Sequence, residues 1–208
     1  GGAQRYVEAM TKKFKNSIRV DCPVVRVDRS ADGVELHTRT GGTFEFDRVI
    51  FATHADTTLQ LLSNPTDSET EILSQFEYQQ NDAILHTDQS WLPKSHRAWA
   101  SWNYHVSDEP TAPASVTYDV NRLQQLGCSR PLCVTLNPTR AIPDRDVIKR
   151  IVYRHPVFSA GTLTTQKRQQ EINGKNRSFF CGAYWGFGFH EDGLRSGLTV
   201  TKFFGKEL

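Results

Sequence analysis

The sequence lacks the features that would assign it at once to a membrane, nucleic-acid-binding or secreted class. No apolar run approaches the roughly 18 residues of a membrane-spanning helix, so no transmembrane segment is predicted. Lysine and arginine are scattered, and their densest cluster is only Lys12-Lys13-Phe14-Lys15. With a formal net charge of +2, this pattern argues against nucleic-acid binding. The chain starts Gly1-Gly2-Ala3-Gln4, with neither an initiator methionine nor a signal peptide. We therefore expect a cytoplasmic chain that is a piece of a longer protein.

Motifs for metal binding and covalent catalysis are also missing. The four cysteines, at positions 22, 128, 133 and 181, form no CxxC motif and lie at no zinc-binding spacing from a histidine. The seven histidines include no HExxH motif, and no P-loop occurs. The residues around Ser196 do not match the G-x-S-x-G turn of a serine hydrolase. We expect reduced, buried thiols, no metal site, and no catalytic residue that the sequence alone identifies.

The pattern of apolar residues predicts an α+β fold. Helices are predicted over residues 3–15, 56–62, 69–76 and 161–172. Strands are predicted over residues 18–28, 34–40 and 43–51, with a hairpin at Gly41-Gly42, and then over 78–87, 96–106, 114–121, 131–137 and 147–154. The run Val49–Ala52 is apolar without alternation, which is typical of a strand in a parallel sheet covered on both faces.

The order of these elements predicts two domains, the first of which is discontinuous. Residues 1–62 form a helix and a β-meander that belong to the first domain. Residues 63–160 form an antiparallel substrate domain, and residues 161–208 return to the first domain. The return is predicted because the last apolar strand and the run 49–52 both have the character of central strands in one covered sheet. The aromatic residues of 91–104 allow two interpretations, either cross-strand pairs in a core or the wall of a substrate cavity.

The last thirty residues predict a strand, a glycine-rich turn and an amphipathic helix. Phe179–Cys181 is the apolar strand, and three glycines then let the backbone approach a neighbouring group closely: Gly182, Gly186 and Gly188. Glu191 and Asp192 suit the positive end of the helix that follows. A helix N-terminus behind such a turn offers free N–H groups to an anion or an electron-rich carbonyl, as a cofactor pocket requires.

The apolar residues of this last helix are expected to fall on one face, which would pack on the core. They are Leu194, Leu198 and Phe203.

In this order, the motifs of the chain resemble the FAD-dependent amine oxidase superfamily. The motifs that carry the resemblance are Gly1-Gly2 before a helix, Val24-x-x-Val27, Asp32-Gly33-Val34, the segment Phe46–Thr53 and the closing segment Phe179–Gly197. Within the superfamily, His155–Phe158 and the ending Gly188–Gly193 resemble a bacterial subgroup of predicted NAD/FAD-binding proteins. The resemblance covers nearly the whole chain. It implies an α/β FAD-binding portion joined to an antiparallel substrate domain with flanking helices.

The resemblance implies contacts with the dinucleotide part of FAD. Val24 would meet the adenine through its backbone. Ala52 and Thr53 would form the loop beneath the dinucleotide, and Gly182 and Ala183 would lie at the ribityl and pyrophosphate groups.

It also implies contacts with the flavin ring. Gly188 would shape the turn, and the amides of Phe189, His190 and Glu191 would face the N1–C2=O edge, where a helix N-terminus stabilises the negative charge of reduced flavin. The residues expected to form the floor of the substrate site are Trp185 and Phe187.

The sequence departs from the family pattern in three ways. No β-α-β unit with G-x-G-x-x-G is present, so this chain alone is expected to bind FAD weakly or not at all. Ala183 stands where many relatives carry an acid, and no lysine can be assigned to flavin N5.

We therefore expect the chain to be the carboxy-terminal portion of an FAD-dependent oxidoreductase. It would transfer a hydride from a small apolar or amine-containing substrate to flavin N5. The alternative is a non-catalytic binding module that holds an apolar ligand or a protein partner.

Overall fold

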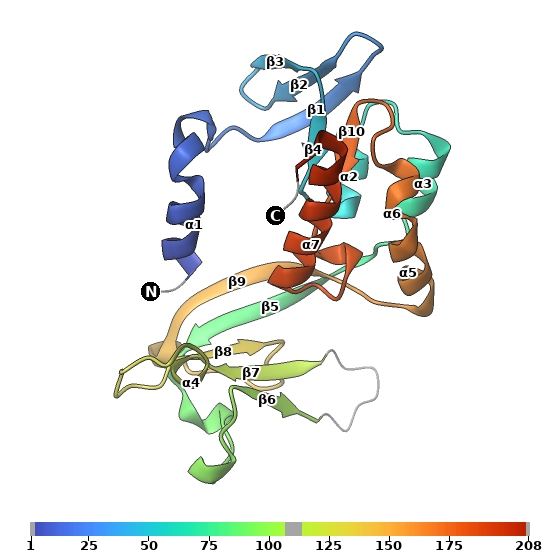
Figure 1. Ribbon diagram of the computed structural model, residues 1–208. Helices are drawn as coiled ribbons and strands as arrows, with labels where there is room; N and C mark the ends of the chain where they lie inside the picture. Colours follow the sequence, from blue (N-terminus) through green and yellow to red (C-terminus); the bar gives the residue numbers. More distant parts are fainter. Residues whose placement is uncertain (1–2, 107–113, 207–208) are drawn as a thin grey trace. The chain divides into compact units, whose positions relative to one another are not determined.

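The computed structural model describes residues 3–106 and 114–206, and it has the α+β fold that the sequence predicts (Figure 1). Gly1-Gly2, which contributes to the family resemblance, lies outside the described residues. The chain divides into two compact units. We call Met10–Gln79 with Pro156–Leu208 the meander unit, and Gly1–Ala9 with Gln80–His155 the sheet unit. The boundaries expected from the sequence, after residues 62 and 160, stay a prediction.

The chain begins with α1 (Ala3–Thr11) and a 3-10 segment, η1 (Lys12–Ser17), and then enters a three-stranded antiparallel meander. Its strands, in the order β1-β2-β3, are β1 (Val24–Arg29), β2 (Val34–Thr38) and β3 (Thr43–Phe46). The predicted strand over 18–28 is wrong in its first half. Asp21 adopts a left-handed φ of 54°, and Pro23 has no N–H for a strand ladder, so pairing starts only at Val24. The predicted helix over 3–15 keeps its α-helical form only to Thr11.

A short parallel pair joins distant parts of the chain in the meander unit. It consists of β4 (Val49–Phe51) and β10 (Ser178–Phe180), with Phe51 opposite Phe180. Their rings stack with centroids 5.4 Å apart. The prediction that the last strand and the run 49–52 belong to one parallel sheet is therefore confirmed. The expected central position, covered on both faces, is wrong for β4, because this sheet has only two strands among the described residues and Ile50 is 49% exposed. Two helices follow β4, namely α2 (Ala55–Leu61) and α3 (Asp67–Leu73).

The core of the meander unit contains one buried ion pair. Arg29 and Glu69 are each only 2% exposed and are joined by two hydrogen bonds of 2.7 and 2.9 Å. Arg29 also donates to Ser178 Oγ and to the carbonyl oxygen of Asn64. Glu69 in turn caps α3, because its carboxylate accepts the N–H of Thr66. The pair therefore fixes β1, α3 and β10 to one another.

The end of the chain is helical but more interrupted than the sequence suggests. The predicted helix 161–172 is divided into α5 (Ala160–Thr165), the 3-10 turn η5 (Gln166–Arg168) and α6 (Gln169–Ile172). After β10 come η6 (Ala183–Trp185), α7 (His190–Thr201) and η7 (Lys202–Phe204).

The predicted apolar face of the last helix is wrong. Leu194 and Phe203 are exposed, whereas Ser196 and Val200 are buried. The reason is a polar contact, since Ser196 Oγ accepts the N–H of Gly182 and donates to the carbonyl of Gly193. The helix therefore turns its small residues toward the β10 loop.

The sheet unit contains a five-stranded sheet in the order β6-β7-β8-β5-β9. Its strands are β5 (Tyr78–His86), β6 (Trp102–His105), β7 (Ser115–Asp119), β8 (Cys133–Leu136) and β9 (Val147–Pro156), and its helical segments are η2 (Gln89–Trp91), η3 (His96–Ala98), α4 (Val120–Gln124) and η4 (Asp144–Asp146). The predicted strand 96–106 is wrong before Trp102, where η3 and a loop precede β6. The predicted strand 114–121 ends at Asp119, whose side chain caps α4.

The aromatic residues of 91–104 have different environments. Trp91 is 1% exposed and packs in the core of the sheet unit with Ile84 and Ile142. Trp102 and Tyr104 are exposed on the sheet, and Trp102 forms a cross-strand edge contact with Tyr118 at 5.5 Å. The core interpretation therefore holds for Trp91. A substrate wall formed by the exposed rings stays a prediction.

None of the described helices is long and apolar enough to cross a membrane.

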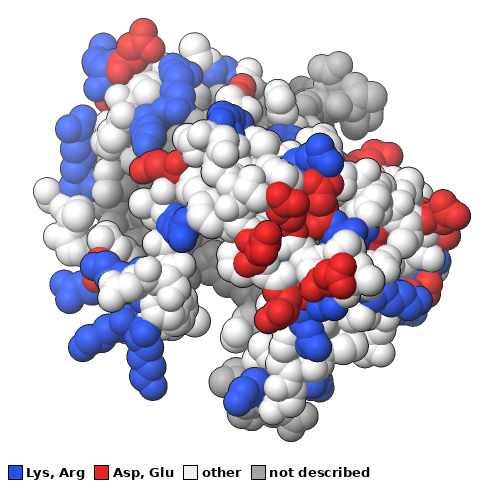
Figure 2. Space-filling view, turned by 90° about the horizontal axis from the view of Figure 1, so that it is seen from above, with Lys and Arg blue, Asp and Glu red and all other residues white. Residues whose placement is uncertain are grey.

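All four cysteines are free thiols, as expected, but the prediction that all four are buried is wrong. Cys133 is buried, Cys22 and Cys181 are half-buried, and Cys128 is exposed. Acidic and basic side chains are interspersed on the face shown in Figure 2.

One face of the sheet carries a buried chain of hydrogen bonds. His86 Nε2, Thr135, Thr117 and His105 Nε2 are linked by three contacts of 2.8 Å each. His86 Nδ1 accepts the N–H of Asp88, so His86 Nε2 carries the proton and donates to Thr135. Burial lowers the pKa of His86 more than the nearby carboxylates of Asp88 and Asp146 raise it.

The lowered pKa predicts that acid destabilises the sheet unit. Below the ordinary histidine pKa of 6.5, the unfolded chain binds a proton that folded His86 excludes, so the free energy of unfolding falls as the pH falls. Urea unfolding at about pH 7 and about pH 5 measures the effect. An NMR titration of the imidazole is the direct check, and a midpoint at or above the ordinary value contradicts the prediction.

Breaking the buried ion pair should destabilise the meander unit strongly. Glu69→Leu leaves Arg29 buried and unpaired, at an expected cost of about 3–5 kcal/mol in urea unfolding. The double variant Arg29→Met/Glu69→Leu should recover much of that loss. Glu71→Ala, on the exposed side of the same helix, is the control: it breaks only a solvent-exposed pair with Arg168, and such pairs contribute little to stability, so the midpoint should change little. A Glu69→Leu variant as stable as the control would contradict the role given to the pair.

Candidate functional site

The candidate site lies at the carboxyl ends of the parallel strands β4 and β10. Because Phe51 and Phe180 are paired, the loops that begin at Ala52 and at Cys181 leave the same edge of the sheet. The Cys181 N–H extends this pairing by donating to the carbonyl of Phe51 at 2.9 Å. In α/β folds, ligands bind at the carboxyl ends of parallel strands. The register therefore brings Ala52 and Thr53 to the same edge as Gly182 and Ala183.

The loop after β4 is fixed by side-chain contacts. Thr53 Oγ1 lies 2.7 Å from Thr58 Oγ1, and the N–H of Ala55 donates to the hydroxyl of Tyr78 at 2.9 Å. His54 stacks on the Tyr78 ring with a centroid distance of 4.4 Å. Ala52 and Thr53 are themselves exposed, so their backbone is accessible and well positioned.

The turn after β10 depends on two glycines. Gly182 has a φ of +156°, and a Cβ there would lie 2.5 Å from Cε1 of Tyr184. Gly186 lies against Asp192, whose Cγ would be 2.4 Å from an added Cβ. The carbonyl of Ala183 closes the turn by accepting the N–H groups of Gly186 and Gly188, both at 3.1 Å. The close backbone approach predicted for Gly182 and Gly186 is therefore confirmed, and its partners are side chains of the chain itself. At Gly188 the same prediction is wrong, because the nearest atom to an added Cβ is Phe158 Cζ at 3.8 Å.

Asp192 organises the start of α7. Its Oδ2 accepts the N–H of Phe187 and the N–H of Phe189, each at 3.0 Å. Phe189 is the N-cap of the helix, with φ −87° and ψ 161°. The carboxylate therefore holds the turn against the helix and lies at its positive end.

The helix start also offers two unused donors. No acceptor among the described residues bonds the N–H of His190 or the N–H of Glu191, which are the first two residues of α7. Both residues are exposed. The N–H of Phe189, by contrast, is occupied by Asp192. An anion or an electron-rich carbonyl can therefore bind to two of the three predicted amides.

The two aromatic residues predicted to form the floor of the substrate site have different environments. The Trp185 ring packs on Phe76 at 5.1 Å and is half-buried. Phe187 is 63% exposed and lies 6.2 Å from the ring of Phe158. Burial raises the pKa of the Tyr184 hydroxyl well above its ordinary value, and the nearby Tyr78 and Cys181 raise it further. The Tyr184 hydroxyl and the Trp185 indole N–H are both buried and reach no hydrogen-bond partner of acceptable geometry among the described residues.

Val24, which was also predicted as a site residue, lies on β1 and not in the two loops that form the candidate site. It is the first residue of β1, pairs with Thr38 before a bulge, and packs against the core of the meander unit. The register of β4 and β10 therefore does not bring it to the turn, and its contact with the adenine stays a prediction.

Three residues that support the turn or the loop after β4 were not predicted as site residues. Gln166 donates to the carbonyl oxygens of Tyr184 and Gly186. Ser196 binds the N–H of Gly182, and Tyr78 supports the loop after β4. No local sequence pattern marks them, because each acts across 14 or more residues of chain. Asp192 could have been identified from its place in the first turn of a helix.

One group of possible metal ligands occurs among the described residues. Asp28, Glu35 and His37 place ligand atoms within 4.8 Å of one another on the meander, away from the turn. Asp28 already binds Arg26 at 2.8 Å and His37 at 2.7 Å. A hydrogen bond from Ser63, followed by Arg26, lowers the pKa of Asp28 to about 2. These protein partners account for the group.

Comparison with known proteins gives a family match and several similar folds. The family described as flavin containing amine oxidoreductase matches residues 1–118. None of the curated proteins matches. A CLA-producing fatty acid isomerase from P. acnes has a TM-score of 0.69 at 16% identity, over 98% of this chain and 52% of that chain.

Two further solved structures have similar folds. A redesigned variant of putrescine oxidase has a TM-score of 0.66 at 11% identity, over 99% of this chain and 53% of that chain. A reduced UDP-galactopyranose mutase has a TM-score of 0.63 at 14% identity, over 95% of this chain and 50% of that chain. The chain thus spans about half the length of the structures it matches.

The contact between Gly186 and Asp192 predicts that alanine destabilises the protein at Gly186 but not at Gly197. In Gly186→Ala the new methyl group displaces the Asp192 carboxylate and breaks its bonds to two N–H groups, which should cost about 1–3 kcal/mol. Gly197→Ala, inside α7 with no atom within 4 Å of the added Cβ, is the control. It should be neutral or stabilise by up to about 1 kcal/mol. Thermal or urea unfolding of both variants checks this, and equal midpoints would refute the role of Asp192.

Proposed function

Since this chain belongs to the flavin-containing amine oxidoreductase family, we propose that it is part of an FAD-dependent oxidoreductase and that the turn between β10 and α7 contacts the flavin. The observation that carries the proposal is the pair of unused N–H groups at His190 and Glu191. They stand at the carboxyl edge of a parallel strand pair, behind a turn that requires glycine at Gly182 and Gly186.

The donor set of the turn fits a flavin. A helix N-terminus stabilises negative charge, and the N1–C2=O edge of reduced flavin carries it. In our proposal the N–H groups of His190 and Glu191 hold this edge. Phe189 does not donate, because its N–H is bound to Asp192, and it acts as the N-cap that fixes the other two. Gly188, with a φ of +89°, lets the turn enter the helix.

The proposed dinucleotide contacts come from the loops at the same edge. Ala52 and Thr53 offer an exposed backbone that Thr58 and Tyr78 hold in place. Gly182 and Ala183 begin the turn without a side chain larger than a methyl group, which permits close approach. Val24 is proposed to meet the adenine through its backbone.

The proposed reaction is hydride transfer, for which bound FAD would supply the acceptor at flavin N5. The residues of the chain orient the ring and stabilise charge on it, and no acid–base residue is needed. The substrate is proposed to be a small apolar or amine-containing molecule, with Phe187 and the exposed edge of Trp185 as its nearest contacts. The similar structures include an isomerase, an oxidase and a mutase, so the fold does not select the reaction, and the oxidoreductase assignment rests on the family.

The cytoplasmic location stays a prediction, which the free thiols support.

The first test is the visible absorption spectrum of the full-length protein, purified without added cofactor. A flavin band that survives desalting supports the proposal and allows substrates to be screened by anaerobic bleaching. A colourless protein that also fails to take up added FAD refutes it and favours the non-catalytic binding module.

A proline substitution tests the helix N–H groups directly. His190→Pro removes one N–H, yet proline is well accepted at the first helical position, and the extended Phe189 backbone suits the residue before a proline. His190→Ala is the matched control, because it removes the same side chain and keeps the N–H. We expect His190→Pro to weaken FAD binding about tenfold relative to His190→Ala, with equal thermal stability of the apoproteins.

Flavin fluorescence during FAD titration measures both affinities. If the two variants bind FAD equally, the His190 N–H does not contact the cofactor. If both lose FAD relative to the unsubstituted protein, the imidazole rather than the amide makes the contact.

A further inference from the structure

One hollow of the meander unit lies at the opposite edge of the parallel pair from the proposed flavin contacts. Its volume is about 850 Å³, and it is lined by residues that precede β4 and β10, by the end of β1 and by η7. Three arginines line it, Arg29, Arg48 and Arg177, and its lining includes no aspartate or glutamate from the part of the chain that the structure describes. A volume of this size is in the range of small-molecule sites.

Arg29 forms the floor but has no donor left for a ligand. Its guanidinium gives two bonds to Glu69, one to Ser178 Oγ, one to the Asn64 carbonyl and one, at 3.4 Å, to Asn64 Oδ1. Those bonds use all five N–H groups. Its charge is also neutralised by Glu69 at 2.7 Å. The basic character of the hollow therefore comes from the other two arginines.

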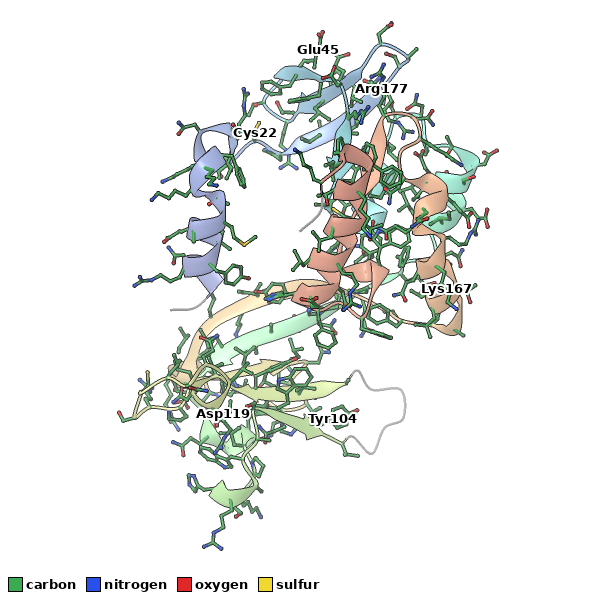
Figure 3. All side chains as sticks on the ribbon, viewed as in Figure 1. Cys22, Glu45, Tyr104, Asp119, Lys167 and Arg177 are labelled. Carbon is green, nitrogen blue, oxygen red and sulfur yellow. The ribbon has the colours of Figure 1, made fainter. Side chains whose placement is uncertain are left out.

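Arg177 is held at the rim by a strained backbone. Asn176 and Arg177 both adopt left-handed conformations, with φ of 47° and 58°. Strain of this kind persists where surrounding contacts fix it, and it is common at ligand clamps. Here Arg177 Nε and Nη2 donate to the carbonyl of Ala31, and Nη1 donates to the carbonyl of Asp47 at 3.1 Å. Figure 3 shows Arg177 between the meander and the start of β10.

These bonds fix the Arg177 guanidinium without neutralising it. All of its acceptors are main-chain carbonyls, and it forms no ion pair with a described carboxylate. Two of its five N–H groups stay available. A positioned guanidinium with free donors is suited to phosphate or carboxylate.

Arg48 is the second available cation. It is exposed, lies over the Phe204 ring at 5.4 Å, and forms no hydrogen bond or ion pair with a described residue. Arg48 and Arg177 also line an adjoining hollow together with Asp47, so their side chains share one space. The carboxylate of Asp47 pairs with neither arginine.

An apolar wall stands beside the two arginines. Phe203 is 45% exposed, and its ring is fixed by an edge contact of 5.4 Å with Phe179. Gly174, with a φ of +79°, makes room for this ring, because an added Cβ would lie 3.0 Å from Phe203 Cε1. The exposed part of Phe203 is therefore a rigid surface within the same hollow.

We propose that this hollow binds a phosphomonoester whose organic part is apolar, with the phosphate between Arg48 and Arg177 and the apolar part against Phe203. Paired guanidinium groups recognise phosphate through charge-assisted hydrogen bonds. The hollow itself has no aspartate or glutamate among its described lining residues, and the single Asp47 carboxylate of the adjoining hollow leaves a net positive charge beside the two arginines. Other acids of the meander, Asp32 and Glu45 among them, line a neighbouring hollow, which shares Arg29 and Ser30 with this one. The site needs no flavin and does not rest on the proposed oxidoreductase function.

The test uses phenyl phosphate as the probe, titrated into the full-length protein by isothermal calorimetry. Arg48→Ala should weaken binding about tenfold, because it removes a charge-assisted contact from a side chain without other bonds. Arg39→Ala is the matched control, since it removes one exposed charge of the same unit that lines neither hollow. Phe203→Ala should reduce affinity for phenyl phosphate while affinity for inorganic phosphate stays unchanged.

His190→Pro separates this site from the proposed flavin contacts, and it should leave the binding of phenyl phosphate unchanged. The proposal is overturned if the unsubstituted protein does not bind phenyl phosphate, or if Arg48→Ala and Arg39→Ala weaken binding equally, which would indicate general charge attraction. It is also overturned if His190→Pro abolishes binding, because the probe would then occupy the helix N-terminus.

Discussion

The buried ion pair between Arg29 and Glu69 is the contact on which the meander unit depends. Two charges that are each 2% exposed are tolerated only when every donor and acceptor is satisfied, and here all five arginine N–H groups have partners. Through Ser178 the pair reaches β10, and through the α3 cap it reaches the segment after β4. The same contact therefore secures the two strands whose ends carry both proposed sites.

The two proposed sites of the meander unit lie at opposite edges of the parallel pair β4 and β10. At the carboxyl edge, the loops offer backbone N–H groups and a glycine turn, which suit an electron-rich ring. At the amino edge, the residues before each strand supply Arg48 and Arg177, which suit a phosphate. Each strand is only three residues long, so the pairing of these three residues positions the loops at both edges.

Much of this fold could be predicted from the sequence, because its signals are local. The apolar run 49–52, the Gly41-Gly42 hairpin and the glycine-rich strand–turn–helix ending each depend on neighbouring residues, and each is present in the structure. Of the predictions that failed, one depended on a distant contact and another on the local backbone. The last helix does not bury Leu194 or Phe203, because Ser196 bonds to the Gly182 amide and sets the helix rotation. The strand expected from residue 18 starts late, because a left-handed Asp21 and Pro23 interrupt it.

The sequence by itself determined the fold class, the family and the stretch that carries the proposed cofactor contacts, since composition, spacing and motif order are properties of the chain. Only the tertiary structure decided which amides of that stretch are free. Asp192 occupies the Phe189 N–H and leaves those of His190 and Glu191 unused. Only the tertiary structure also joined Arg29 to Glu69 across 40 residues and brought Arg48 and Arg177 to one hollow. The physical reason is that hydrogen bonds and charges act over a few ångströms, and which groups come that close is set by packing.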